Sequence, residues 1–197
     1  MTEEPLDRNK TDLTHRLTAL AMIYLENRGF RPVETEVPIA GFGIVDLGGF
    51  VTPTPTEVMK LRLNIQRKFG LAGERYDEVM FHYGPILTAV VEIKVTRADF
   101  KKDIERKFNS NWPAHLCYLA YPKDLLAESE LPSGWLGLES DSNGGTLRRR
   151  HWNRPVVHPQ HPGIVAEFLA ALAVRTDKRT RFARWRYMLK MHRAGNM

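Results

Sequence analysis

The run from 89 to 95 constrains the fold most, because it carries two charged residues inside a stretch that is otherwise typical of a buried strand. Side chains alternate between the two faces of a strand, so Glu92 and Lys94 share one face while Val91 and Ile93 occupy the other. A buried carboxylate without a partner is costly. We therefore expect Glu92 to have a cationic partner, either a side chain or a divalent cation.

A second acid lies upstream in a similar setting. In Ile44-Val45-Asp46-Leu47 a single carboxylate stands inside an apolar strand that is followed by glycines. If the two strands are neighbours, Asp46 and Glu92 are hard oxygen donors that could hold one divalent cation. An alternative is that Glu92 and Lys94 form an ion pair on the wet face of a surface strand, which leaves Asp46 unexplained.

The surrounding pattern predicts an alternation of helices and strands. Apolar residues at helical spacing predict a helix over 12–28, and the strand at 33–38 leads through a turn at 40–43 into the Asp46 strand. After Lys94, a helix is expected over 97–108 and a buried strand over 116–121. The expected order is helix, three strands, helix and strand.

An Asp on one strand followed by Glu-x-Lys on the next resembles the PD-(D/E)xK nuclease superfamily. Within it, the chain is most similar to the MmcB-like DNA-repair family, on Glu92-Ile-Lys94-Val-Thr-Arg97-Ala-Asp99-Phe100 and on a later strand ending in Tyr-Pro. Val45 stands where the superfamily usually has proline. The resemblance implies an α/β fold with a restriction-endonuclease-like αβββαβ core, a mixed central sheet flanked by helices, and a helical C-terminal extension.

The same resemblance implies a metal-dependent DNA nuclease that acts in DNA repair or nucleic-acid processing. Mg²⁺ or Mn²⁺ would be held by Asp46, Glu92 and the backbone carbonyl of Ile93, and Lys94 would orient or help deprotonate the attacking water. The alternative is a catalytically inactive nucleic-acid-binding module, or a scaffold of a repair or phage complex.

A further acid often completes such a site. Similarity to the MmcB-like pattern favours Glu36, on the strand before Asp46, and similarity to resolvase-type members favours Glu26, near the end of the first helix. We expect Glu36 to complete the site, with Glu26 as the alternative. Asp99 is expected to cap its helix or to orient Lys94, with a metal role as the alternative.

Charge is unevenly distributed along the chain. The net charge is +6, but residues 148–197 carry twelve Lys or Arg against two acids, whereas residues 1–147 carry an excess of acids. Such a basic segment suits a phosphate backbone, and its interleaved aromatics could stack on bases. The alternative is that 163–174 and the segment after it form amphipathic core helices with solvated arginines. Residues expected to contact nucleic acid are Arg97, Lys101, Lys102, Lys107, Arg148, Arg149, Arg150, Arg181, Arg184 and Arg186.

Length and composition suit one compact domain. The resemblance implies a nuclease-like domain over 1–160, with an insertion at about 52–85, followed by a basic helical extension over 161–197. No apolar run has the length of a membrane span and the N-terminal residues do not resemble a signal peptide. We expect a cytoplasmic protein whose partner is DNA, with RNA left open as a substrate. A two-fold homodimer is also left open, since such dimers are frequent when both strands are cut.

Overall fold

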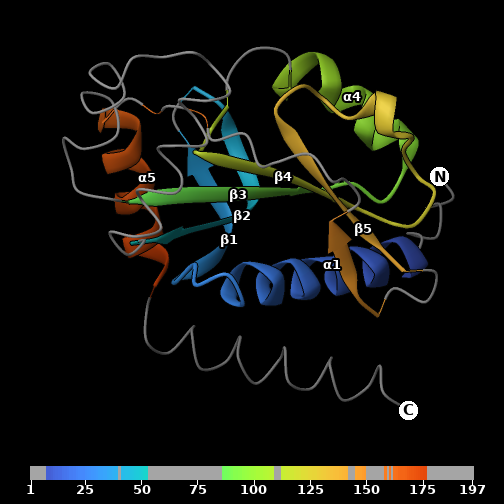
Figure 1. Cartoon of the computed structure of the whole chain (residues 1–197), viewed down its shortest axis with the longest axis horizontal. Coiled ribbons are helices and arrows are strands. Elements are labelled where there is room, and N and C mark those ends of the chain that lie inside the picture. Colours follow the sequence, from blue (N-terminus) through green and yellow to red (C-terminus); the bar gives the residue numbers. More distant parts are fainter. Residues whose placement is uncertain are drawn as a thin grey trace, which may run out of the picture.

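The chain folds into one mixed β-sheet with helices on both faces, which makes it an α/β protein (Figure 1). The computed structural model describes residues 8–39, 41–52, 86–108, 112–141, 145–149, 158, 160 and 162–176. The expected insertion at 52–85 and the basic segment after 176 lie almost entirely outside these residues. The predicted helix at the start of the chain, the three strands that follow it, the helix at 97–108 and the strand at 116–121 are confirmed. The elements are α1 (Arg8–Glu26), β1 (Val33–Ile39), β2 (Gly43–Val51), β3 (Leu87–Ile93), α4 (Arg97–Lys107), β4 (Leu116–Tyr121), the 3₁₀ helix η1 (Glu128–Glu130), β5 (Trp135–Ser140), β6 (Leu147–Arg149) and α5 (Pro162–Arg175).

The six strands lie in the order in which they occur in the sequence, from β1 to β6. β1, β2 and β3 are successively antiparallel, β4 runs parallel to β3, β5 runs parallel to β4, and β6 is antiparallel to β5. A parallel pair requires a crossover, and α4 supplies it between β3 and β4. The carboxyl ends of β3, β4 and β5 therefore meet at one edge of the sheet.

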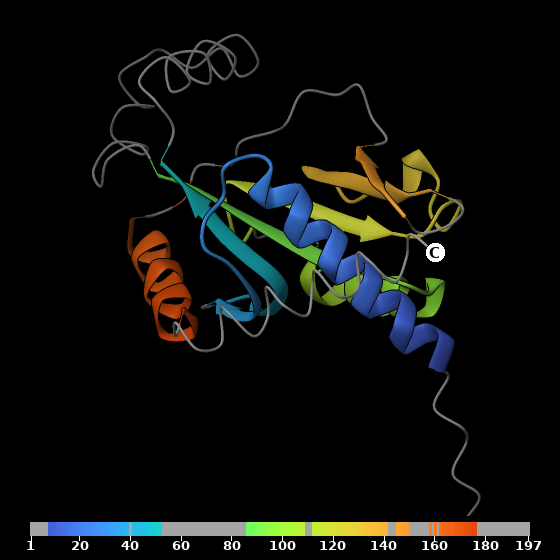
Figure 2. The same cartoon turned by 90° about the horizontal axis from the view of Figure 1, so that it is seen from below.

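Two hydrophobic cores lie on opposite faces of this sheet. The helix α1 crosses one face, where Leu17 and Leu25 pack with residues such as Val91 of β3 (Figures 1 and 2). The other face is covered by α4 and α5, through side chains that include Phe100 and Phe168. Every residue of β3 is buried, as expected for a strand covered on both sides.

The helix α4 begins at a defined N-cap and is anchored on the sheet by buried aromatic side chains. Thr96 is its N-cap, and the Thr96 side chain accepts a hydrogen bond from the Asp99 N–H at 3.2 Å. Phe100 and Phe108 are buried against the sheet with ring centroids 6.3 Å apart. Because these apolar anchors fix the helix, Asp103 and Lys107, three and seven residues after Phe100, are held on the same face of α4 over β3.

The hairpin of β1 and β2 changes faces midway along its length. Residues two apart normally share a face, but Val45 packs in the core under α4 and α5, whereas Leu47 packs in the core under α1. In β1, Val33 and Val37 are divided between the cores in the same way. Glu36 lies at this point with a left-handed φ of 52°, which accounts for the reversal in β1. Simple alternation fails here.

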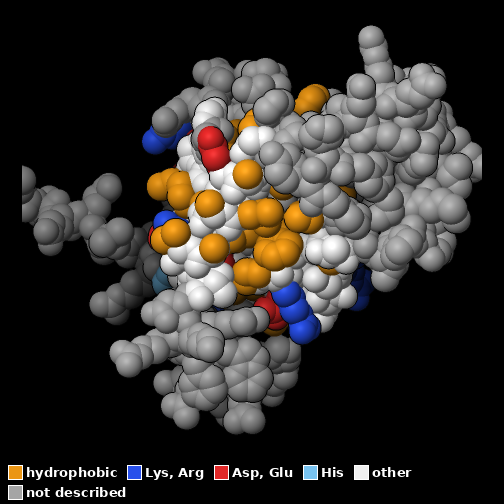
Figure 3. All heavy atoms as spheres, turned by 90° about the vertical axis from the view of Figure 1, so that its left-hand side faces the viewer, with side chains coloured by type: hydrophobic (Ala, Val, Ile, Leu, Met, Phe, Trp, Pro, Cys, Tyr) orange, Lys and Arg blue, Asp and Glu red, His pale blue; other side chains and the backbone are white. Residues whose placement is uncertain are grey.

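The helix α5 closes the sheet at the β1 side. Phe168 and Leu172 are buried in the core shared with α4, which confirms the expectation of an amphipathic core helix at 163–174. The ζ carbon of Phe168 lies 3.0 Å from where a Cβ on Gly48 would be, so β2 needs glycine there for close packing. Figure 3 views this side of the molecule, and described hydrophobic side chains gather near its centre. Among the described helices, none has the length and hydrophobicity needed to cross a membrane.

Candidate active site

The carboxyl end of β3 carries two buried charged residues. Glu92 is 1% exposed and Lys94 is 7% exposed, so the interpretation of this strand as a surface strand with one wet face is wrong. Glu92 lies two residues after Val90 in β3, so both side chains point to the face covered by α4. Lys94 follows directly after β3, and its backbone N–H donates to the carbonyl of Ala120 on β4 at 2.9 Å. Both side chains are therefore fixed beneath α4.

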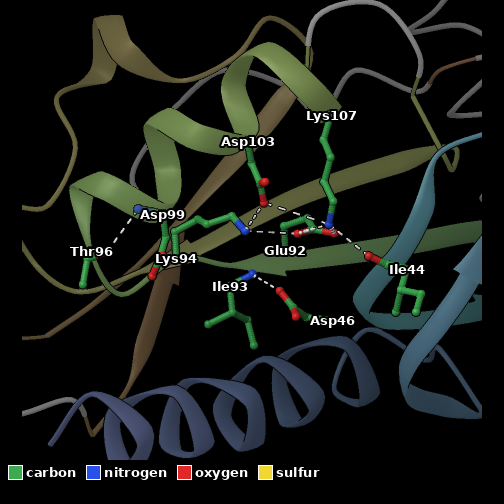
Figure 4. A network of polar contacts seen from close by, with 9 residues as sticks. All are labelled: Ile44, Asp46, Glu92, Ile93, Lys94, Thr96, Asp99, Asp103 and Lys107. Carbon is green, nitrogen blue, oxygen red and sulfur yellow. Dashed lines mark hydrogen bonds and ion pairs between the residues drawn. The ribbon is translucent and has the colours of Figure 1, made fainter. Parts of the chain in front are cut away.

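Four charged side chains from β3 and α4 form one network, which we call the charged cluster: Glu92, Lys94, Asp103 and Lys107. Lys94 Nζ donates to Asp103 Oδ2 at 2.6 Å and to Glu92 Oε2 at 3.4 Å. Lys107 Nζ lies 3.2 Å from each oxygen of Glu92 and 4.0 Å from Asp103 Oδ2. Figure 4 shows these groups between β3 and the turns of α4 above it. Every charge in the cluster has an opposite charge beside it.

The Glu92 carboxyl has a strongly perturbed pKa. Burial, and to a smaller extent the negative charge of Asp46, raise the pKa of Glu92 to about 7 against the lowering effects of Lys94 and Lys107. Two ammonium groups therefore do not fully compensate the cost of removing this carboxylate from water. A further positive charge near Glu92 would therefore stabilise the ionised form of this carboxyl.

Lys94 is held in its protonated form. Burial lowers the pKa of Lys94, but the hydrogen bond to Asp103 and the charges of Glu92, Asp103 and Asp46 outweigh burial and leave that pKa above its ordinary value. The ammonium therefore acts as a fixed positive charge and hydrogen-bond donor. Of the two roles expected for Lys94, orienting a water fits this state, whereas removing a proton from water requires a neutral amine.

Asp46 joins the site at the point where β2 leaves β3. The ladder between these strands ends at the pair Leu47 and Val91. Two residues further along β3, the Ile93 N–H donates to the side chain of Asp46, at Oδ2, over 2.6 Å (Figure 4). The carboxylate thus satisfies a backbone donor that the sheet leaves over. Asp46 is also close enough to raise the pKa values of Glu92 and Lys94.

Lys107 does not extend into solvent, as a phosphate-contacting residue would. Its ammonium lies against Glu92 and also donates to the backbone carbonyl of Ile44, at the start of β2, at 3.0 Å. The resemblance predicts the Ile93 carbonyl as a metal ligand, but the contact seen at Ile93 is from its N–H to Asp46. The backbone carbonyl that contacts the Lys107 ammonium is that of Ile44.

The other acids predicted for the site lie on three different elements, β1, α1 and α4. Glu36 is exposed, between pairs of the β1–β2 ladder that flank Asp46 on the other strand. Glu26 is half-buried at the last residue of α1, the helix on the opposite face from α4. Asp99 lies in the first turn of α4, where its backbone N–H donates to the side chain of the N-cap residue Thr96. The ion pair that holds Lys94 on α4 comes from Asp103, one turn further on.

Asp103 is absent from the residues predicted for the site, although a signal for it exists. Asp99, Asp103 and Lys107 repeat every four residues, which places them on one face of α4. What the spacing lacks is the direction of that face. Only packing of Phe100 against the sheet shows that the face is turned toward Glu92.

The other residues expected to contact nucleic acid divide between the two faces. Lys101 and Lys102 are exposed on α4, and Arg97 is exposed and paired with Glu130 of η1. Arg149 of β6 pairs with Leu138 of β5. Its charge, with that of Arg28, partly offsets the burial that raises the pKa of Tyr24 on α1. Those outside the described residues are Arg150, Arg181, Arg184 and Arg186; Arg148 is exposed on β6.

The donor set of the site consists of oxygens. Among the described residues, no three or more His, Cys, Asp or Glu side chains lie together as a group that could hold a metal ion by themselves. Glu92, Asp46 and the Ile44 carbonyl supply two carboxylates and one backbone oxygen, a set that would need water and a substrate oxygen to fill the shell of a divalent cation.

Comparison with known proteins identifies no family for the chain. No family model matches it, and no curated protein is significantly similar. A solved structure, the SPO1766 protein of unknown function from Silicibacter pomeroyi, is similar to the chain with a TM-score of 0.48 and 18% identity, over 82% of this chain and 87% of that one.

Proposed function

We propose that this protein is a metal-dependent nuclease that hydrolyses phosphodiester bonds in DNA on a restriction-endonuclease-like fold. One observation carries the proposal. Asp46 on β2 and the Glu92–Lys94 pair on β3 lie together where the two strands separate, with Glu92 buried and Lys94 kept charged. Perturbed ionisable groups of this kind are enriched at functional sites.

The order of the elements supports the same proposal. The series α1, β1, β2, β3, α4 and β4, with three antiparallel strands and a parallel fourth, has the arrangement expected for an αβββαβ core. In this proposal β5 and β6 extend the sheet, and α5 begins the C-terminal extension. A fold of this kind hosts many activities, so the chemistry depends on the side chains.

The cluster fits a hard divalent cation, because a cation already lies among its oxygens. Lys107 Nζ is held by both carboxylate oxygens of Glu92 and by the Ile44 carbonyl, and Mg²⁺ and Mn²⁺ prefer the same donors. Asp46 would contribute through Oδ1, since Oδ2 bonds the Ile93 N–H. A bound ion would polarise a phosphate oxygen and lower the pKa of a bound water.

The roles of the protein groups follow from their contacts. Lys94 would donate to the attacking water or to a phosphate oxygen, which orients the water and offsets negative charge in the transition state. Asp103 would hold the Lys94 ammonium in place through the 2.6 Å ion pair. The burial of Glu92 excludes water from one side of the site and strengthens each of these interactions.

DNA is proposed as the substrate because cations lie exposed beside the cluster. Lys101 and Lys102 occupy the outer turns of the helix that carries Asp103 and Lys107. Contacts from these residues to a phosphate backbone would add affinity that is independent of sequence and that falls as salt rises. RNA is the second substrate to be tested, since phosphate contacts alone do not separate the two polymers.

The test is cleavage of labelled single-stranded, duplex and branched DNA, and of RNA, with Mg²⁺ or Mn²⁺. We expect Asp46→Asn and Lys94→Met each to lower the cleavage rate by about a hundredfold or more while DNA binding remains. Asparagine is chosen at Asp46 because it keeps an oxygen that can accept from the Ile93 N–H. The matched controls are Glu167→Gln on α5 and Arg31→Met before β1, both exposed, and both should cut at the wild-type rate.

A second candidate function is a nucleic-acid-binding module without catalysis. The observation that favours it is that Lys107 and Lys94 already neutralise most of the negative charge around Glu92. Such a protein would bind DNA and cut none of the substrates with either metal. A scaffold of a larger complex would neither bind nor cut.

A further inference from the structure

The ammonium of Lys107 lies where a metal ion would be expected in the proposed site. Three oxygens surround it within hydrogen-bonding distance: Glu92 Oε1 and Oε2 at 3.2 Å and the Ile44 carbonyl at 3.0 Å. A fourth, Asp103 Oδ2, lies at 4.0 Å. These oxygens come from β2, β3 and α4, so the Lys107 ammonium lies at the junction of three elements (Figure 4).

We propose that Lys107 is a built-in counter-ion that keeps the cation position filled and must leave Glu92 before a divalent metal ion can bind. The inference rests on the proposed metal-dependent function and adds a regulatory step to it. Metal affinity would then be set by competition with an ammonium from the same chain. Lys107 would bind weakly enough to be displaced and closely enough to keep the site closed without metal.

Formal charges support an exchange of this kind. Asp46, Glu92 and Asp103 carry three negative charges when ionised, and Lys94 with Lys107 supplies two positive ones, which leaves a net negative charge. If a divalent cation replaces Lys107, the same three carboxylates face three positive charges and the buried group becomes neutral. A neutral arrangement is favoured in a buried site, because an uncompensated charge is costly there.

The position of Lys107 allows the exchange without unfolding. Lys107 is the last residue of α4, its side chain is 23% exposed, and its four-carbon chain can reach solvent. Its ammonium lies 5.8 Å from the ring centroid of Phe42, which offers a second favourable contact beside the cluster. Lys94 differs, because Asp103 holds it at 2.6 Å and its side chain is only 9% exposed. Once released, Lys107 would be available to a DNA phosphate, the role expected for it from the sequence.

The experiment is calorimetric titration of the full chain with Mn²⁺, comparing wild type with Lys107→Met and Lys102→Met. Methionine keeps the length and apolar stem of lysine and removes the charge. We expect Lys107→Met to bind Mn²⁺ about tenfold more tightly or better than wild type. Lys102→Met removes an exposed charge from the same helix and should bind Mn²⁺ as wild type does.

A second measurement on the wild-type chain needs no variant. Lysine side-chain NMR during titration with Mg²⁺ should show a large change in the Lys107 ammonium signal and little change for Lys102. Equal Mn²⁺ affinity of wild type and Lys107→Met, with an unchanged Lys107 signal, would overturn the proposal while leaving the nuclease function intact if the wild type cuts DNA. Absence of Mn²⁺ binding in both proteins, together with absence of cleavage, would overturn the metal-dependent function as well.

Discussion

Replacing Glu92 by Gln should change how the free energy of unfolding depends on pH, and replacing His115 by Asn should change it in the opposite sense. Glu92 has a folded pKa of about 7, raised from 4.5, so the folded state binds more protons than the unfolded state between these values. Stability contributed by Glu92 is present at low pH and is lost as pH rises toward 7. The full effect is about 3 kcal/mol.

His115 acts in the reverse direction. Burial, with a smaller effect of His158, lowers the pKa of His115 to about 4 from 6.5, and its Nδ1 accepts a hydrogen bond from the Thr88 N–H at 3.1 Å. The unfolded state therefore binds the extra proton, and stability contributed by His115 is lost as pH falls from 6.5 toward 4. Between about pH 4.5 and 6.5 the two residues oppose each other, so the wild-type dependence on pH is weakened.

Urea denaturation in metal-free buffer, over a range from about pH 4 to 8, measures both effects. We expect stability of Glu92→Gln to rise with pH through this range more steeply than that of wild type. Stability of His115→Asn should instead fall with pH. The control is Glu167→Gln, an exposed change on α5. If the Glu92→Gln profile superimposes on that of wild type, Glu92 does not titrate near neutral pH and its burial does not raise its pKa.

Truncating Phe100 to Ala should cost about 3–5 kcal/mol of stability, because it leaves a large cavity beneath α4. Phe100 is 2% exposed and packs beside Phe108. Its loss should also weaken the packing of α4 against the sheet, so that Asp103 no longer holds Lys94 at a fixed position. The cleavage rate of the folded variant is expected to fall by about tenfold or more, since small displacements of reacting groups are costly.

The comparison is Phe168→Ala on α5, a residue of the same core that is 1% exposed. Its loss of stability should be similar, but its cleavage rate should remain close to wild type, because α5 carries none of the charged cluster. Both rates are measured at a temperature where urea titration shows both variants folded. Equal losses of cleavage in the two variants would contradict a specific role for the packing of α4 in positioning Asp103.

The sequence predicts much of this arrangement, for identifiable reasons. The bounds of α4 and β4 follow from periodicity and caps, and Asp46, Glu92 and Lys94 stand out because charged residues are rare in strands of this kind. The partners of these charges could not be obtained in the same way. Whether Lys107 faces solvent or Glu92 depends on how α4 is rotated over the sheet, which is set by contacts of Phe100 with residues far away in the sequence.

The role of Asp46 in the sheet was equally beyond a pattern of alternation. It depends on β2 pairing with β3 only from Leu47 onward and on the left-handed backbone of Glu36, which local sequence does not specify. A glutamate at positive φ carries no composition signal of the sort that glycine gives. The same limit applies to Ile44, whose contribution is a backbone carbonyl and is therefore independent of its side chain.

The change of face in the β1–β2 hairpin has a consequence for how damage spreads through the molecule. The root of the hairpin, with Val33 and Leu47, is packed with α1, and its outer part, with Val37 and Val45, is packed with α5. Asp46 thus lies at the boundary between two separately packed halves. A cavity made in one half leaves the packing of the other half in place, so the intact core still holds the hairpin and the Asp46 carboxylate at its boundary.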